Sequence, residues 1–133
     1  MTLGVRGLVL DDQRRVLLVR HTYVEGFYLP GGGVETGETL VDALKRELHE
    51  EANVLLEEPP ELFGVYFNRR FSVRDHVALY VARSYRITAP RAPDREIAEA
   101  GFFALDALPA ETTVATRARL AEALEQAPIS PYW

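Results

Sequence analysis

The chain contains no cysteine, so it can form neither a disulfide framework nor a thiolate zinc site. No apolar run reaches the roughly 18 uncharged residues that a membrane-spanning helix needs. Positive charge is also scarce, because 15 Lys and Arg residues stand against 20 Asp and Glu and the formal net charge is −5. Since general nucleic-acid binding depends on a basic surface, we expect neither nucleic acid nor membrane as a partner. The missing cysteines and the missing signal-peptide pattern fit a cytoplasmic protein.

The chain has the length and apolar content of one ordinary domain, with 133 residues of which 47% are hydrophobic. We therefore expect a single domain over residues 1–133. Apolar periodicity predicts strands at 3–10, 15–20, 61–71, 76–86 and 100–105, a short extended piece at 27–30, and helices at 40–52 and 113–127. This order predicts an α/β (α+β) chain, arranged as an α/β/α sandwich with a mixed β-sheet between helices.

The helix expected at residues 40–52 has a start signal and a stop signal. Thr39 can cap its first turn, with Asp42 three residues later in the capping-box position. Asn53 follows the last expected helical residue, and asparagine tolerates the left-handed conformation that often ends a helix. A run of three glycines at 31–33 precedes the helix. Because glycine has no side chain, this run lets the backbone pass close to a ligand or metal.

Three glutamates of this helix are spaced i, i+3 and i+4, so they share one side of it. On a helical wheel, Glu47 and Glu51 fall within the apolar stripe and Glu50 lies at its edge. The stripe consists of Leu40, Leu44 and Leu48. Inward-facing carboxylates that crowd each other cost free energy unless a cation offsets their charge. A hard divalent ion that prefers oxygen ligands, such as Mg²⁺ or Mn²⁺, is therefore expected beside them.

The charged residues of this region follow a fixed pattern. In chain order it reads Gly32, five residues, Glu38, seven residues, Arg46-Glu47-Leu48, one residue, Glu50-Glu51, one residue and Asn53-Val54. The pattern resembles the Nudix box at every charged position and departs from it at Asn53, where the family usually has glycine. The stretches YLPGGG before it and EIAEAGFFALDALP near the end look like the usual flanks of Nudix hydrolases.

This resemblance implies a Nudix fold and a pyrophosphohydrolase that cleaves a nucleoside diphosphate linked to another group, with Mg²⁺ or Mn²⁺ as cofactor. The implied metal ligands are Glu47, Glu50, Glu51 and the Gly31 carbonyl. Arg46 would pair with a box carboxylate and keep it ionised and oriented. Glu38 would brace the glycine loop. The number of metal ions is left open.

Water would attack one phosphorus in line and release a nucleoside monophosphate and a phosphorylated remainder. In the family the base is a box glutamate or an acid from a later loop. Glu96 is favoured over Glu99 here, because it lies in a proline-containing loop just before the last strand and can swing toward the site. The candidate catalytic residues are Glu47, Glu51, Glu96 and Arg46.

The candidate substrate contacts are Arg20, Arg69 and Glu38, and Arg70 and Arg74 complete the basic set from which a phosphate contact is expected. His21 is either a substrate contact or an ordinary loop histidine.

The expected substrate is a small molecule, a nucleotide sugar, an ADP-ribose-like compound or a nucleoside triphosphate. A non-catalytic Nudix-fold sensor is the alternative, although such modules usually lose box glutamates. Many relatives pair through their sheets, so a homodimer is also considered.

Overall fold

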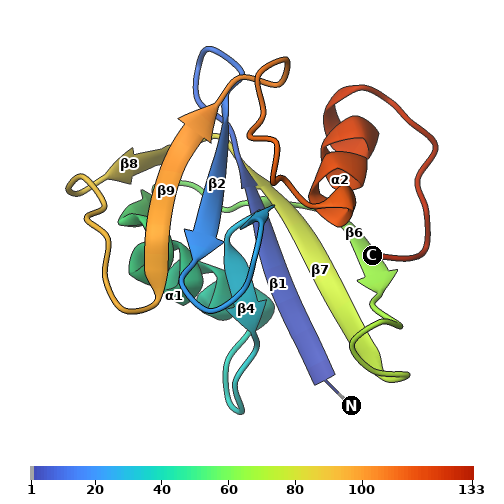
Figure 1. The fold of residues 1–133 in the computed structure, drawn as a ribbon. Coiled ribbons are helices and arrows are strands. Elements are labelled where there is room, and N and C mark those ends of the chain that lie inside the picture. The colour runs from blue at the N-terminus through green and yellow to red at the C-terminus, as the bar shows by residue number, and fades with distance from the viewer. Residues whose placement is uncertain (1) are drawn as a thin grey trace.

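The computed structural model describes residues 2–133 and consists of strands and two helices (Figure 1). In chain order the elements are β1 (Thr2–Val9), β2 (Val16–His21), β3 (Phe27–Tyr28), β4 (Gly31–Gly33), α1 (Leu40–Ala52), β5 (Val54–Leu56), β6 (Glu61–Phe67), β7 (Asp75–Ala82), β8 (Tyr85–Ile87), β9 (Ile97–Phe103) and α2 (Val114–Leu124). The class predicted from the sequence, a mixed α/β chain, is confirmed.

The main sheet has the strand order β4-β1-β7-β6 and is mixed. Strands β1 and β7 are parallel, in a register that runs from Thr2 opposite Asp75 to Val9 opposite Ala82, whereas β4 and β6 are antiparallel to their neighbours. A second sheet has the order β3-β2-β9, and β5 pairs with β8. The pairing of β1 with β4 brings the glycine run alongside the first strand, directly opposite Arg6.

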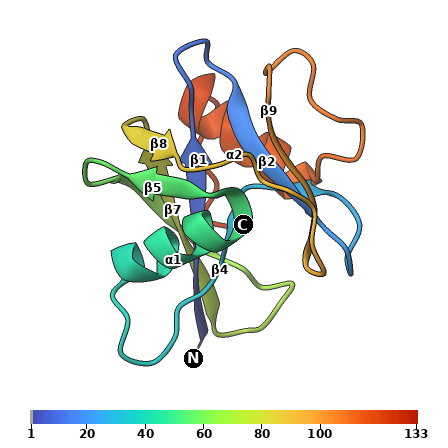
Figure 2. The ribbon, with the colours of Figure 1, turned by 90° about the vertical axis from the view of Figure 1, so that its left-hand side faces the viewer.

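Each helix covers one face of the main sheet, as the two ribbon views show (Figures 1 and 2). Side chains of a strand alternate between its faces, so Val5 of β1 packs with Leu44 and Leu48 of α1, whereas Leu8 packs in the core that includes Leu120 of α2. Leu44 and Leu48 are fully buried, which stabilises the fold by about 1.5–3 kcal/mol each. The α/β/α layering predicted from the sequence is therefore confirmed.

Both ends of α1 lie where the sequence predicts them. The Thr39 hydroxyl accepts a hydrogen bond of 3.0 Å from the Asp42 amide. At the other end Asn53 is left-handed, with φ 56° and ψ 33°, and its backbone N–H donates to His49. The Asn53 side chain also donates to the carbonyl oxygen of Ala89 at 3.2 Å. Asparagine thus ends the helix in place of glycine and ties it to a later loop.

Several strand ends differ from the sequence expectation. The strand expected at 76–86 stops at Ala82, and β8 follows as a separate strand. Strand β8 pairs with β5, and the sequence analysis did not predict β5. The strand expected at 61–71 ends at Phe67, because residues 68–74 form turns. The last strand begins at Ile97 instead of residue 100, and the last helix spans 114–124 instead of 113–127. Apolar alternation alone does not locate such ends.

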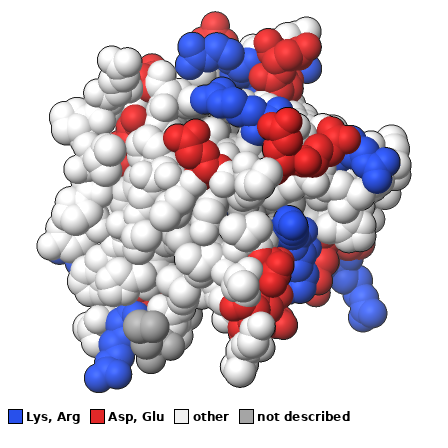
Figure 3. Space-filling view, turned by 180° about the vertical axis from the view of Figure 1, so that it is seen from behind, with Lys and Arg blue, Asp and Glu red and all other residues white. Residues whose placement is uncertain are grey.

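Two further features concern the charge of the surface and the length of the helices. On the face seen from behind, Lys and Arg side chains are interspersed with Asp and Glu (Figure 3). In the part of the chain that the structure describes, neither helix has the length and hydropathy needed to cross a membrane.

Replacement of Asn53 tests the role of the left-handed helix end. We expect Asn53→Ala to destabilise the protein by about 1–2 kcal/mol, because an alanine in this conformation is strained. Asn53→Gly should cost less, since glycine adopts positive φ without strain. Urea denaturation of both variants measures the difference. Equal stability of Asn53→Ala and the parent would contradict this account.

Candidate active site

A cleft of about 710 Å³ lies between the second half of α1, strand β4 and the loops after β2 and before β9. Figure 2 shows α1 beside β4, and the two elements are in contact. The carboxylates in the cleft lining are Glu47, Glu50, Glu51 and Glu96. We refer to it as the glutamate cleft. It brings the three glutamates of the helix together with the glycine run, as the sequence spacing predicts.

Glu51 is held by both of its carboxylate oxygens. The Gly31 amide donates to Oε1 at 2.9 Å, and His21 Nε2 lies 2.8 Å from Oε2. Both side chains are buried, with 8% exposure for each of the residues His21 and Glu51. A Cβ at Gly31 would lie 2.0 Å from the Val5 carbonyl oxygen. Only glycine therefore allows this backbone to lie close enough to hold Glu51.

Arg46 of α1 connects the helix to the loop that precedes it and to the glycine run. Its guanidinium donates to both carboxylate oxygens of Glu38, at 2.8 and 2.9 Å, and to Glu47 Oε1 at 2.8 Å. It also donates to the Gly33 carbonyl at 3.1 Å. Hydrogen bonds from Arg46 and from the Glu35 amide lower the pKa of Glu38 to about 2, and the bond to Glu38 raises the pKa of Arg46. Both groups are therefore ionised at neutral pH.

The surroundings of Glu47 disfavour its ionised form. Burial raises the pKa of its carboxyl group, and the neighbouring charge of Glu51 raises it further, whereas the hydrogen bond from Arg46 lowers it. A carboxylate in this state gains stability from an additional cation. The observation fits a divalent ion at this place, because carboxylate and carbonyl oxygens are its preferred ligands.

The carboxylates do not yet converge on one point. Within residues 2–133, no three His, Asp or Glu side chains are arranged to hold a common metal ion. Glu47 is directed to Arg46 and Glu51 to Gly31 and His21. Glu50 is largely exposed and lies 3.7 Å from Arg46. Binding of an ion would therefore require the side chains of Glu47 and Glu50 to reorient.

A family model described as the NUDIX domain matches residues 1–124. The chain belongs to the Nudix family. It is 34% identical over 108 residues to an ADP-ribose pyrophosphatase of Methanocaldococcus jannaschii, an alignment that covers 80% of this chain and 63% of that protein. It is 41% identical over 64 residues to the mouse 8-oxo-dGDP phosphatase NUDT18, covering 46% of this chain and 20% of that protein. The chain thus spans less than two thirds of these curated relatives.

Solved structures agree with the family assignment. A MutT Nudix hydrolase from Burkholderia pseudomallei superimposes with a TM-score of 0.77 at 28% identity, covering 92% of this chain and 97% of that one. An ADP-ribose pyrophosphatase from Streptococcus suis gives a TM-score of 0.69 at 23% identity, with 99% and 95% covered, and this likeness concerns the fold alone. The Nudix fold predicted from the sequence is confirmed.

The two acids considered as the base lie in different surroundings. Glu96 lines the glutamate cleft, in the residue just before β9. Within residues 2–133, its carboxylate has no hydrogen-bond or ion-pair partner. Glu99 lies two strand positions after Ile97, pairs with Arg20 at 3.5 Å and is absent from the lining of the cleft. The fold therefore places Glu96, and not Glu99, with the Nudix box glutamates.

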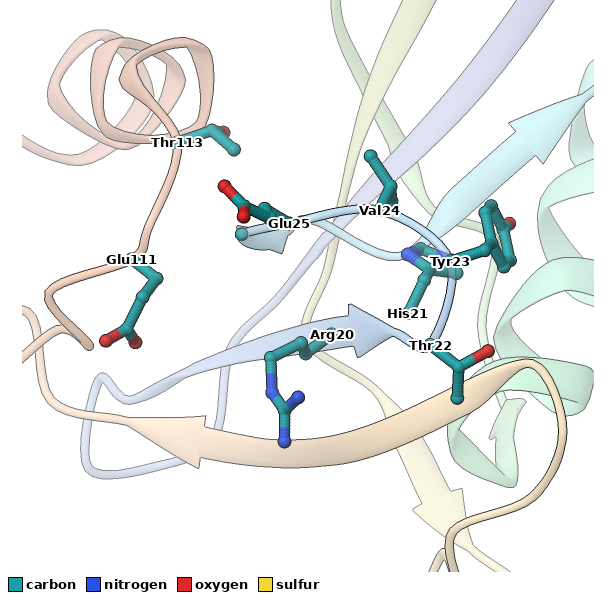
Figure 4. Close-up of a pocket in the computed structure, with 9 residues that line it drawn as sticks. Arg20, His21, Thr22, Tyr23, Val24, Glu25, Glu111 and Thr113 are labelled. Atoms are coloured by element: carbon teal, nitrogen blue, oxygen red, sulfur yellow. The ribbon is translucent and has the colours of Figure 1, made fainter.

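The expected substrate contacts lie outside the glutamate cleft. Arg20 lines a neighbouring cleft of about 800 Å³, together with Glu25 and Glu111 (Figure 4). Arg69 lies over the Tyr132 ring, 3.8 Å from its centroid. Glu38 is held by Arg46. The fold does not bring Arg20 and Arg69 together with the box glutamates, whereas Arg46 links Glu38 to Glu47. Contact of these three residues with a substrate stays a prediction.

Two residues of the glutamate cleft were missed or left undecided by the sequence analysis. Arg6 lines the cleft from β1, and His21 holds Glu51 from the end of β2. A charged residue within an otherwise apolar strand was the available signal for Arg6. For His21 there was no local signal, because its partner is 30 residues away in the sequence.

Replacement of Gly32 tests how closely Glu47 approaches the glycine run. A Cβ at Gly32 would lie 2.5 Å from Glu47 Oε1, whereas a Cβ at Gly33 would meet no atom within 4 Å. We expect Gly32→Ala to displace Glu47 and weaken Mn²⁺ binding about 10-fold or more, as displaced ligands typically do. Gly33→Ala is the matched control and should bind Mn²⁺ like the parent. Calorimetry measures both affinities, and equal losses in the two variants would contradict the account.

Proposed function

We propose that this chain is a metal-dependent Nudix hydrolase that cleaves the diphosphate linkage of a nucleoside diphosphate derivative. The observation that supports it most is the crowding of Glu47 and Glu51 against the glycine run, with the pKa of Glu47 raised by burial and by Glu51. The hydrogen bond from Arg46 only partly offsets the burial and repulsion that raise the pKa of Glu47, so an additional cation would stabilise the pair. Its place in a cleft beside Glu96 supports a functional role for the pair over a purely structural one.

Glu47, Glu50, Glu51 and the Gly31 carbonyl are the proposed metal ligands. Mg²⁺ or Mn²⁺ supplies neutralisation of the phosphate oxygens and a lower pKa of bound water. The Gly31 amide and His21 fix the Glu51 carboxylate, and Arg46 fixes Glu47. The contacts to Glu51 hold its carboxylate in place before an ion arrives, whereas the side chains of Glu47 and Glu50 would have to reorient to reach the ion.

Glu96 is the proposed general base. Its carboxylate faces the cleft without a competing partner among the described residues, so it is available to accept a proton from the attacking water. The water oxygen forms a bond to one phosphorus while the bond from that phosphorus to the bridging oxygen breaks. The products are a nucleoside monophosphate and a phosphorylated remainder.

The proposed substrates are a nucleotide sugar, an ADP-ribose-like compound or a nucleoside triphosphate. The names of two relatives, an ADP-ribose pyrophosphatase and an 8-oxo-dGDP phosphatase, support this range. Contacts from Arg20, Arg69 and Glu38, a cytoplasmic location and a homodimer belong to the same proposal. The retained box glutamates favour a hydrolase over a sensor.

Replacement of Glu51 tests the metal site. Glu51→Gln removes a charge with little change of shape, so the protein should fold while Mn²⁺ affinity and the rate of nucleoside monophosphate release fall about 100-fold or more. Glu58→Gln, an exposed glutamate in a loop, is the control. A Glu51→Gln variant that hydrolyses ADP-ribose, UDP-glucose or ATP at the parent rate would exclude Glu51 as a ligand.

A pair of variants tests the base. Glu96→Gln should lower kcat by about 100-fold or more at unchanged Mn²⁺ affinity, because the amide cannot accept a proton from the attacking water. Glu99→Gln, which alters only the contact with Arg20, should have little effect. Small and equal effects of the two changes would return the role of the base to a box glutamate.

A further inference from the structure

The segment between β8 and β9 carries Glu96, the proposed base, and we refer to residues 88–96 as the Glu96 loop. These residues form neither helix nor strand. A carboxylate serves as a general base only when it lies within hydrogen-bond reach of the proton that it accepts. The contacts that hold this loop therefore decide whether Glu96 can act.

Asp94 fixes the backbone on both sides of Glu96. Its Oδ1 accepts hydrogen bonds of 2.8 Å from the amides of Glu96 and Ile97. The Thr22 amide, in the loop after β2, donates to the Glu96 carbonyl oxygen at 2.9 Å. The backbone of Glu96 is thus held at its N–H and at its C=O, while its side chain lines the glutamate cleft.

Asp94 keeps its negative charge at neutral pH. The hydrogen bonds from the Ile97 and Glu96 amides, together with one from Arg91, lower the pKa of its carboxyl group to about 2. Hydrogen bonds to an ionised acceptor are stronger than those between neutral groups. The charge of Asp94 therefore strengthens its hold on the loop.

Arg91 connects Asp94 to the end of α1. Its Nη2 donates to Asp94 Oδ2 at 2.7 Å, and its Nε donates to the Glu50 carbonyl oxygen at 3.2 Å. Its Nη1 donates to the Ala92 carbonyl oxygen. The Glu50 carbonyl belongs to the last turn of the helix, where carbonyl groups lack a partner within the helix. Each nitrogen of the guanidinium thus donates to a protein oxygen, which leaves few donors for a substrate.

Asn53 forms a second connection between α1 and the Glu96 loop. Its side-chain amide donates to the carbonyl oxygens of Ala89 and Pro90, at 3.2 and 3.4 Å. Its own carbonyl oxygen accepts a hydrogen bond of 3.0 Å from the Thr88 amide. Both connections end at the last turn of α1, which carries two of the box glutamates.

A hollow of about 370 Å³ lies between the Glu96 loop and α1. Its lining includes the three box glutamates together with Arg91, Asp94 and Glu96. The Arg91 side chain is only 12% exposed, although it belongs to a loop. The connection through Arg91 therefore lies directly beside the proposed metal ligands and the proposed base.

We propose that Arg91 and Asp94 are positioning residues, which act through the backbone of Glu96 and hold the base at a fixed place relative to the metal ligands on α1. Misplacement of a reacting group by about 1 Å can lower a rate about 100-fold. The two residues thus affect the rate without touching the substrate. This inference rests on the proposed function, because it concerns the base of the same reaction.

Replacement of Asp94 tests the connection by structure and by rate. In Asp94→Ala the amides of Glu96 and Ile97 lose their acceptor, so their hydrogen exchange, followed by NMR, should become about 10-fold faster or more. The kcat for whichever of ADP-ribose, UDP-glucose and ATP the parent cuts should fall about 10-fold or more, with KM and Mn²⁺ affinity unchanged. Asp94→Asn keeps an oxygen for the two amides and should recover part of both losses. Asp106→Ala changes an exposed aspartate in a turn and is the control, which should behave like the parent.

Replacement of Arg91 tests the contact with α1. Arg91→Gln should lower kcat at unchanged KM, and Arg91→Lys, which keeps a positive charge beside Asp94, should recover part of the loss. Arg86→Gln, a change of an exposed arginine of β8, is the control. Lower thermal stability at the parent kcat, in both Asp94→Ala and Arg91→Gln, would show that the contacts are purely structural and would overturn the proposal.

A double variant shows whether Asp94 acts through Glu96. In the Glu96→Gln background the base is already lost, so Asp94→Ala should lower kcat by less than about 2-fold further. An equal loss in both backgrounds would overturn the inference. If Glu96→Gln keeps the parent kcat, or if the parent cuts none of the compounds, the proposed base or the proposed hydrolysis fails. Faster exchange of the Glu96 amide in Asp94→Ala would still support the anchoring of the loop, and unchanged exchange would refute it.

Discussion

The site depends on two neighbouring carboxylates that lie against a glycine backbone, the buried Glu51 and the half-buried Glu47. Their mutual repulsion and burial raise the pKa of Glu47, so the fold must supply opposing contacts. It does so with the Arg46 guanidinium, the Gly31 amide and the ring of His21. Each contact satisfies one oxygen and leaves the pair deficient in positive charge. The apolar stripe of α1 leads to this arrangement, because packing of the leucines against the sheet turns the same side of the helix, with Glu47 and Glu51, inward.

Strand pairing positions the other residues of the site near Glu47 and Glu51. Antiparallel pairing of β4 with β1 sets Gly31 opposite Arg6, and pairing of β2 with β9 sets His21 opposite Ile97, which brings Glu96 to the cleft. The register shifts between Arg20 and His21. Arg20 and Glu99, which are paired on the regular part of the ladder, lie away from the cleft, whereas His21 and Glu96 line it. A change of one or two positions along a strand thus decides which acid can take part in the chemistry.

The sequence was most informative where the structure depends on local signals. The limits of α1 follow from the cap at Thr39 and the left-handed Asn53, and the three box glutamates follow from helical spacing. It was less informative where the structure depends on distant partners. Strand β5 is only three residues long, and it is a strand because it pairs with β8. The contact of His21 with Glu51 and the place of Arg6 in the glutamate cleft arise from tertiary packing, and no spacing in the sequence encodes either of them.

Arg46 and Arg6 differ in how their charge is used. Arg46 is hydrogen-bonded to Glu38 and Glu47. It therefore orients these two carboxylates, and their negative charges offset its attraction for a substrate anion. Arg6 has no carboxylate partner among residues 2–133, but a single positive charge cannot balance four glutamates and an incoming diphosphate. In the proposed reaction the deficit must be met by the divalent ion, and the substrate anion in turn offsets the charge of that ion. Metal and diphosphate should therefore each increase the affinity of the site for the other, as linkage requires. In this proposal the acidic lining would restrict anion binding to the metal-loaded state, in which the phosphates could also be cleaved.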